Sequence, residues 1–158
     1  MVGWYYQIYT FRVKTNGEQY ICGMETMKAV YKGNLQTEAT HLQSGTVIMT
    51  DPPVDNQGKG LAFSPTDLLC AAAASCALTI MGIAARTHSI AMDGTTVRIT
   101  KIMAAEPRRV SGIVLEFDMV KSYTEKEQKI LEHAARTCPV LLSLASELTK
   151  DIRFNYPD

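Results

Sequence analysis

Two cysteines lie in one apolar stretch of the chain and are candidates for thiol chemistry. Cys70 and Cys76 both stand in the segment SPTDLLCAAAASCALTIMGIAAR, residues 64–86. A thiol in such a segment is either a small buried hydrophobe or a nucleophile held in a water-poor site. Because burial alone raises the pKa of a thiol and makes it inert, a reactive Cys76 requires a cation nearby.

Cys138 is a further candidate because it directly precedes Pro139, at the predicted start of a short helix. Unpaired backbone N–H groups at a helix start stabilise a thiolate. Proline removes the first of these donors, so the effect depends on the next ones, and Arg136 could add positive charge. The alternative interpretation is a helix-capping residue that happens to be a cysteine.

The other two cysteines are not expected to react. Cys70 precedes Cys76 by six residues, which at about 100° per residue places the two thiols about 240° apart around a helix. They should therefore not form a disulfide with each other, and Cys70 is predicted to be structural. With Cys22 the chain has four cysteines and three histidines but no CxxC pair, so a structural zinc site is not expected.

The composition indicates an ordinary globular domain in a reducing compartment. The chain has 158 residues, 46% of them hydrophobic, and its 16 basic residues balance 16 acidic ones. This balance favours neither nucleic acid nor a membrane as a partner. Asp67, among Ser, Thr and Cys, favours a protein core for the apolar stretch, and the N-terminus has no secretory pattern. We therefore expect a cytoplasmic protein with mostly reduced cysteines.

Helices are predicted to position both candidate thiols. Ser64 can cap a helix over about 65–86, and apolar residues cover every face of it, which is typical of a helix surrounded by protein. The capping signals are completed by Pro65 at the first helical position and Asp67 at the third. A second helix begins after Thr124, with Glu127 three residues on, and is broken at Pro139.

Strands are predicted before and after the long helix in the sequence. Their order predicts an α+β fold with mostly antiparallel sheet. Asn16-Gly17 favours a hairpin turn, residues 51–63 a loop, and residues 32–45 a polar connection. The predicted strands are a hairpin of about 4–14 with 18–23, two strands at 30–31 and 46–50, two at 95–105 and 109–122, and a last one at 151–157. Because methionines stand at positions 24 and 27, residues 1–23 are predicted to be an extra N-terminal hairpin or extension.

Three segments of the sequence resemble the OsmC/Ohr family of osmotically inducible and organic hydroperoxide resistance proteins. SPTDLL…AAAASC, with Pro65 eleven residues before Cys76, resembles the central helix of that family. CPV at 138–140 resembles its second-cysteine motif, and EPRRVSGIVLEF at 106–117 its middle strand region. The resemblance covers about residues 27–156, so residues 24–158 are predicted to be an OsmC-like domain.

The resemblance implies both an architecture and a chemistry. The implied fold is α+β, with mostly antiparallel sheets wrapped around central buried helices in an intertwined homodimer. Cys76 would be the peroxidatic thiol and Cys138 the resolving one, with an organic hydroperoxide as substrate. A lipoylated or other dithiol would reduce the resulting disulfide, and no bound cofactor is expected.

The sequence departs from the pattern of the active Ohr-like members at two positions. Those members supply an arginine from the connection between the first two core strands and a glutamate after the proline of the helix motif. The connection YKGNLQTEATHLQSG holds Lys32 and His41 but no arginine, and Thr66 replaces the glutamate. The chain thus resembles the OsmC-like branch. Supporting residues could be Arg12, Lys32, Thr66, Arg108 and Arg109.

These departures leave an alternative open. In one hypothesis the protein is a thiol-dependent peroxidase for organic hydroperoxides. In the other, the same fold binds a small hydrophobic ligand or senses redox state, with weak or no peroxidase activity. The side chains that surround the Cys76 thiol separate the two hypotheses.

Overall fold

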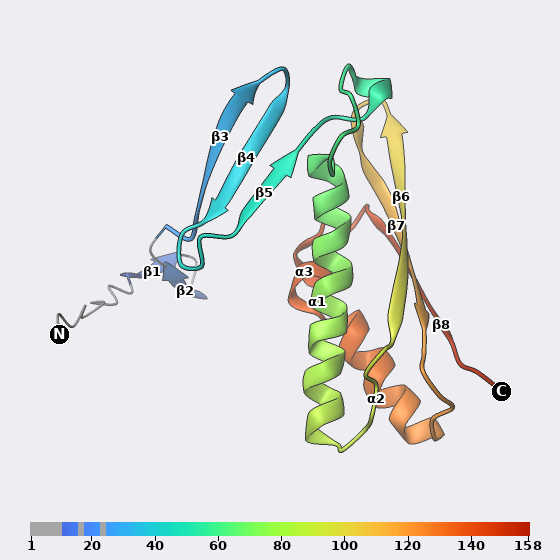
Figure 1. The fold of residues 1–158 in the computed structure, drawn as a ribbon. Coiled ribbons are helices and arrows are strands. Elements are labelled where there is room, and N and C mark those ends of the chain that lie inside the picture. The colour runs from blue at the N-terminus through green and yellow to red at the C-terminus, as the bar shows by residue number, and fades with distance from the viewer. Residues whose placement is uncertain (1–10, 16–17, 23–24) are drawn as a thin grey trace. The chain divides into compact units, whose positions relative to one another are not determined.

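The computed structural model describes residues 11–15, 18–22 and 25–158, which form an α+β fold as predicted (Figure 1). The chain divides into two compact units, Met1–Ser64 and Pro65–Asp158, and each is described by itself. The elements are β1 (Phe11–Thr15), β2 (Glu18–Cys22), β3 (Met27–Gly33), β4 (Gln36–His41), β5 (Val47–Thr50), the 3₁₀ turn η1 (Val54–Asn56), α1 (Pro65–Thr87), β6 (Thr96–Ala105), β7 (Arg108–Asp118), α2 (Glu125–Arg136), α3 (Pro139–Ser143) and β8 (Thr149–Asn155).

The first unit contains an antiparallel hairpin, β1–β2, and an antiparallel sheet in the order β3-β4-β5. The predicted N-terminal hairpin is confirmed where β1 pairs with β2. Its remaining residues, 4–10, 16–17 and 23, lie outside the described part of the chain. The side chain of Arg12 also lies outside it.

Strand β4 was not predicted, because its sequence QTEATH has no large apolar residue. The sequence interpretation of a polar connection is therefore wrong over these residues. Asn34 and Leu35 both have positive φ and form the two-residue turn of a hairpin between β3 and β4. β4 then pairs on both sides, with β3 and with β5, so backbone pairing decides its conformation despite its polar sequence.

The β3-β4-β5 sheet leaves several large apolar side chains open to solvent. Met27 is 66% exposed, Tyr31 65% and Val47 50%. A small sheet needs a covered apolar face for independent stability. Within the described residues of the first unit, this sheet therefore does not complete a core of its own.

The second unit is built around α1, which packs against α2, α3, β6 and β7. In its sheet, β7 is central, pairing antiparallel with β6 and parallel with β8. Ile113, Leu115 and Phe117 point to the buried face, and the Phe117 ring stacks on Phe154 with centroids 5.0 Å apart. This sheet supplies the core against which α1 lies.

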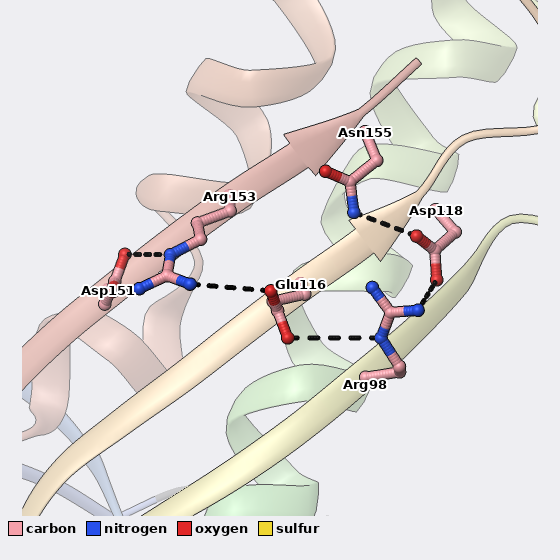
Figure 2. Close-up of polar contacts among 6 residues, drawn as sticks. All are labelled: Arg98, Glu116, Asp118, Asp151, Arg153 and Asn155. Carbon is pink, nitrogen blue, oxygen red and sulfur yellow. Dashed lines mark hydrogen bonds and ion pairs between the residues drawn. The ribbon is translucent and has the colours of Figure 1, made fainter. Parts of the chain in front are cut away.

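A cluster of charged side chains lies on part of the outward face of the same sheet (Figure 2). Arg98 Nη1 lies 3.1 Å from Asp118 Oδ2, and Arg153 Nη1 lies 3.5 Å from Glu116 Oε1. Asn155 Nδ2 donates to the other Asp118 oxygen at 2.9 Å. Because these charges pair across all three strands, the face is suited to water rather than to apolar packing.

Helix α1 has a buried face and an open face within this unit. The prediction of a helix surrounded on every side is therefore met on one side only. The buried residues are Cys70, Ala73, Ala74, Ala77, Met81 and Ala85. Leu69, Ala72, Ser75, Thr79 and Ile83 are exposed.

By length and composition alone, α1 could cross a membrane, with a mean hydropathy of 2.1 over its most apolar window. A single such helix is weak evidence, because the core helix of a soluble protein passes the same test. Within the described residues, 33% of that window is buried inside the protein.

The predicted start signals of the later helices are confirmed. Thr124 and Glu127 form a capping box at the start of α2, since the Thr124 side chain accepts from the Glu127 backbone and the Glu127 carboxylate accepts from the Thr124 backbone. Cys138 is the N-cap of α3, and Pro139 occupies the first helical position. The break at Pro139 thus fixes where the Cys138 backbone stands.

Candidate active site

The structure brings the thiols of Cys76 and Cys138 together inside the second unit. Cys76 lies in the middle of α1, and Cys138 lies at the junction between α2 and α3. The Cys76 thiol is near enough to act on the Cys138 thiol, whose pKa it raises. Cys138 Sγ also lies 4.0 Å from the carbonyl oxygen of Ala73, one turn before Cys76 on α1.

The local sequence explains how Cys138 reaches this position. Helix α2 ends at Arg136, and the Cys138 N–H still bonds to the Ala135 carbonyl at 3.4 Å. Pro139 cannot continue α2, so the chain turns and starts α3 with the Cys138 carbonyl accepting from Leu142 N at 3.1 Å. The cysteine therefore sits at a helix start directed toward α1.

The surroundings of Cys138 keep it protonated at neutral pH. Burial is the main cause and raises its pKa above the ordinary value of 9.0. The backbone N–H groups of Leu141 and Val140 lower the pKa, while the Cys76 thiol raises it further. The predicted stabilisation by the donors that follow Pro139 is present, but burial outweighs it.

Arg136 does not act on the Cys138 thiol. Its guanidinium donates to the Ile152 carbonyl at 3.0 Å and lies over the Phe154 ring, 5.5 Å from the centroid. Among the described residues, no cationic side chain contributes to the shift of the Cys138 pKa.

The other buried cysteine of α1 has different neighbours. Burial raises the pKa of Cys70, Lys101 lowers it, and Asp67 raises it. Because Cys76 interacts with Cys138 and Cys70 with the Lys101 region, the two α1 thiols point to different sides, as predicted.

The family of the chain follows from a match that includes both paired thiols. The family model described as OsmC-like protein matches residues 58–153, which contain Cys76 and Cys138. The chain belongs to the OsmC family.

Solved structures agree with this membership. A protein from Psychrobacter arcticus named for osmotic stress induction and a detoxification response is 49% identical, with a TM-score of 0.82, and the match covers 86% of this chain and 99% of that one. An OsmC-like protein from Mycoplasma pneumoniae is 18% identical with a TM-score of 0.71, covering 84% and 96%. An organic hydroperoxide resistance protein OsmC from Legionella pneumophila is 16% identical with a TM-score of 0.65, covering 87% and 100%. The last two show the fold alone. No curated protein matches the chain.

A half-buried lysine of β6, which contacts the start of α1, was missed by the sequence analysis. Lys101 Nζ lies 2.5 Å from Asp67 Oδ1 and donates to Thr66 Oγ1 at 2.9 Å. It therefore ties the first turn of α1 to strand β6. The alternation of side chains along β6 could have indicated it, because Lys101 lies on the same inward-facing side of the strand as Val97 and Met103.

Thr66, one of the predicted supporting residues, is thus a partner of Lys101. It precedes Cys76 by ten residues, which is about 15 Å along the same helix at 1.5 Å per residue. Within one chain Thr66 is therefore too far to touch the Cys76 thiol. Asp67, predicted as a helix cap, also ion-pairs with Lys101.

The remaining predicted cations of this OsmC-family chain lie as follows. Lys32 is in the first unit, with its Nζ 3.4 Å from Glu38 Oε2. Arg108 and Arg109 are exposed at the start of β7. Their roles toward Cys76, like that of Arg12, stay predictions.

The side chains of this site are suited to thiol chemistry. Across residues 11–15, 18–22 and 25–158, the structure has no group of three His, Cys, Asp or Glu side chains that could hold a metal ion. Two neighbouring thiols can pass between a dithiol and a disulfide, once one of the sulfurs is oxidised.

Proposed function

We propose that this OsmC-family protein is a thiol-dependent peroxidase that reduces organic hydroperoxides through Cys76 and Cys138. The observation that carries the proposal is that the Cys138 sulfur, at the start of α3, faces the Ala73 carbonyl on α1 and is close enough to the Cys76 thiol of α1 to be affected by it. The name of the Legionella pneumophila relative, an organic hydroperoxide resistance protein, supports the choice of substrate class.

In the first step the Cys76 thiolate attacks the distal oxygen of the hydroperoxide. The O–O bond breaks, the alkoxide takes a proton and leaves as an alcohol, and Cys76 becomes a sulfenic acid. The apolar neighbours of Cys76 on α1 favour an alkyl-bearing hydroperoxide over hydrogen peroxide, because an apolar wall gains from covering an alkyl chain.

In the second step Cys138 resolves the sulfenic acid. Its sulfur, deprotonated as it attacks, bonds to Cys76 Sγ, and the hydroxyl group leaves as water. The N–H groups of Leu141 and Val140 stabilise the negative sulfur during this attack. An external dithiol, such as a lipoylated protein, then reduces the disulfide, and the cycle uses no bound cofactor.

The alternative activity, redox sensing or ligand binding without turnover, also follows from one observation. Burial raises the pKa of Cys138, and no cation of the described residues acts on that thiol. A resolving thiol that is rarely ionised at neutral pH reacts slowly, which fits weak or no peroxidase turnover better than efficient catalysis.

The test measures consumption of cumene hydroperoxide with dithiothreitol or a lipoyl reductant, with hydrogen peroxide for comparison. We expect turnover that falls by at least about a hundredfold in Cys76→Ser, because the nucleophile is lost. Cys70→Ser, another α1 cysteine of the same stretch, is the matched control and should keep its activity. If the unmodified protein consumes the hydroperoxide no faster than Cys76→Ser does, the peroxidase proposal is contradicted and the alternative activity remains.

The proposal also includes a second copy of the chain as partner. The open face of α1 carries Leu69 and Ile83, the latter 51% exposed, and the β3-β4-β5 sheet exposes Met27 and Tyr31. Apolar surface of this extent on two elements is typical of an interface. We propose that these faces are covered in a homodimer, in the cytoplasm, without nucleic acid or membrane.

A further inference from the structure

The two paired thiols differ in how accessible they are. Cys138 is 0% exposed and belongs to a core cluster that is formed wholly by residues of the second unit. Cys76 is only partly buried and packs against the edge of that cluster. It lies where the buried face of α1, with Ala73 and Ala77, meets the open face, with Ala72 and Thr79.

The backbone around Cys138 holds this difference in place. The Cys138 carbonyl accepts the first bond of α3 from Leu142 N, and its N–H bonds to Ala135 at the end of α2. Its sulfur faces the Ala73 carbonyl of α1. Moving the Cys138 backbone outward would therefore break the junction between two helices, whereas Cys76 lies at the border between the buried and open faces of α1 and is only partly buried.

We infer that the reductant opens the Cys76–Cys138 disulfide by attacking Sγ of Cys76, so that the reductant is bonded to Cys76 and Cys138 is released first. The inference rests on the proposed function and adds to it the sulfur at which reduction begins. The inference follows from the different accessibility of the two sulfurs, because the thiolate of the reductant must approach the sulfur that it attacks.

The step balances as an ordinary thiol–disulfide exchange. The thiolate of an external dithiol bonds to Cys76 Sγ, the bond to Cys138 breaks, and its electron pair stays on Cys138 Sγ, which then takes a proton. The second thiolate of the reductant attacks the reductant's own bonded sulfur and releases Cys76. The reductant gives up two electrons and becomes a disulfide, and the protein gains them as two thiols.

The surroundings of Cys138 suit its role as the thiolate that is released from the disulfide and stays inside the protein. The backbone N–H groups of Val140 and Leu141, which lower the pKa of Cys138, stabilise the transient thiolate as the sulfur departs. Burial then favours its protonated form and removes it from exchange until the next cycle.

The experiment locates a monothiol on the opened disulfide. The full chain is oxidised in two parallel samples, with cumene hydroperoxide and with diamide, and then treated briefly with glutathione, whose adduct lacks a second thiol to release it. Acid stops the exchange, excess N-ethylmaleimide blocks the free thiols, and peptide mass spectrometry finds both groups. We expect glutathione on Cys76 and N-ethylmaleimide on Cys138, at least about tenfold in excess of the reverse, because access decides the attacked sulfur.

Each outcome has one meaning. Glutathione on Cys138, or equally on both cysteines, overturns the inference. If diamide forms the disulfide but the hydroperoxide does not, the peroxidase proposal is overturned, and the diamide sample still tests the inference. If neither oxidant forms the disulfide, both the peroxidase proposal and the inference are overturned.

If no adduct accumulates, a second measurement decides. The reaction rate with 5,5′-dithiobis(2-nitrobenzoate) is compared between Cys138→Ser, in which Cys76 is free, and Cys76→Ser, in which Cys138 is free, with the labelled cysteine identified by mass spectrometry. Labelling of Cys76 that is at least about tenfold faster supports the inference, since access controls the rate. Equal rates overturn it.

Discussion

At the scale of single residues, the same burial that protects Cys138 also makes the protein sensitive to alkaline pH. Burial raises the pKa of both Cys138 and Cys70 above 9.0 in the folded protein. The unfolded chain exposes these thiols to water and loses their protons near the ordinary value. Between these two pH values the folded state therefore binds more protons than the unfolded state, and the free energy of unfolding falls as pH rises.

We predict from this sign that stability is retained below about pH 9 and declines above it, as the unfolded thiols ionise first. Urea unfolding under reducing conditions at pH 7, 8 and 10 measures the decline. Other groups also titrate in this range, so the unmodified protein is compared with Cys138→Ala. The free energy of unfolding of Cys138→Ala should decline less steeply with rising pH. An identical pH dependence in the two proteins would contradict the role given to the Cys138 thiol.

At the scale of elements, the start of α1 depends on one lysine of β6. The Lys101 side chain is 21% exposed and that of Asp67 39%, so their ion pair is shielded from water more than a surface pair. An exposed pair for comparison is Lys129–Glu125 on α2, with side chains 75% and 82% exposed. The two pairs have similar distances but very different solvation.

A double-mutant cycle with Lys101→Met and Asp67→Asn tests this difference. We predict a coupling free energy of about 1 kcal/mol, because partial burial strengthens the pair. The same cycle with Lys129→Met and Glu125→Gln should give only about 0.3 kcal/mol, as is usual for exposed pairs one helical turn apart. Urea unfolding measures both. Equal couplings would show that the Lys101 pair contributes no more than a surface contact.

The helices and strands differ in how far the sequence could predict them. The α1 boundaries, the capping box of α2 and the α3 start follow from local signals, since Pro, Thr and Glu act on neighbouring backbone groups. Strand β4 and the Lys101 ion pair depend on which segments meet in space. The paired thiols were predicted only through the family resemblance, because 62 residues separate Cys76 from Cys138 and no local rule joins them.

At the scale of the whole molecule, each unit taken by itself leaves apolar surface uncovered. The buried face of α1 is filled by its own unit, but Leu69 and Ile83 on the open face remain exposed. Part of the outward face of the β6-β7-β8 sheet instead carries a group of ion pairs, which Figure 2 shows. An interface therefore fits the open face of α1 and not the charged face of this sheet.

A charge placed on the open face of α1 should consequently break the proposed homodimer. We predict that Ile83→Glu, but not the matched control Thr100→Glu on the outward face of the sheet, reduces the mass in solution from two chains to one. A buried unpaired carboxylate costs several kcal/mol, enough to weaken a micromolar or tighter association by at least about a hundredfold. Light scattering after size-exclusion chromatography measures the mass, and circular dichroism confirms that each variant is folded. A folded Ile83→Glu protein that still has the mass of two chains would place the dimer contact elsewhere, and an unmodified protein with the mass of one chain would remove the homodimer from the proposal.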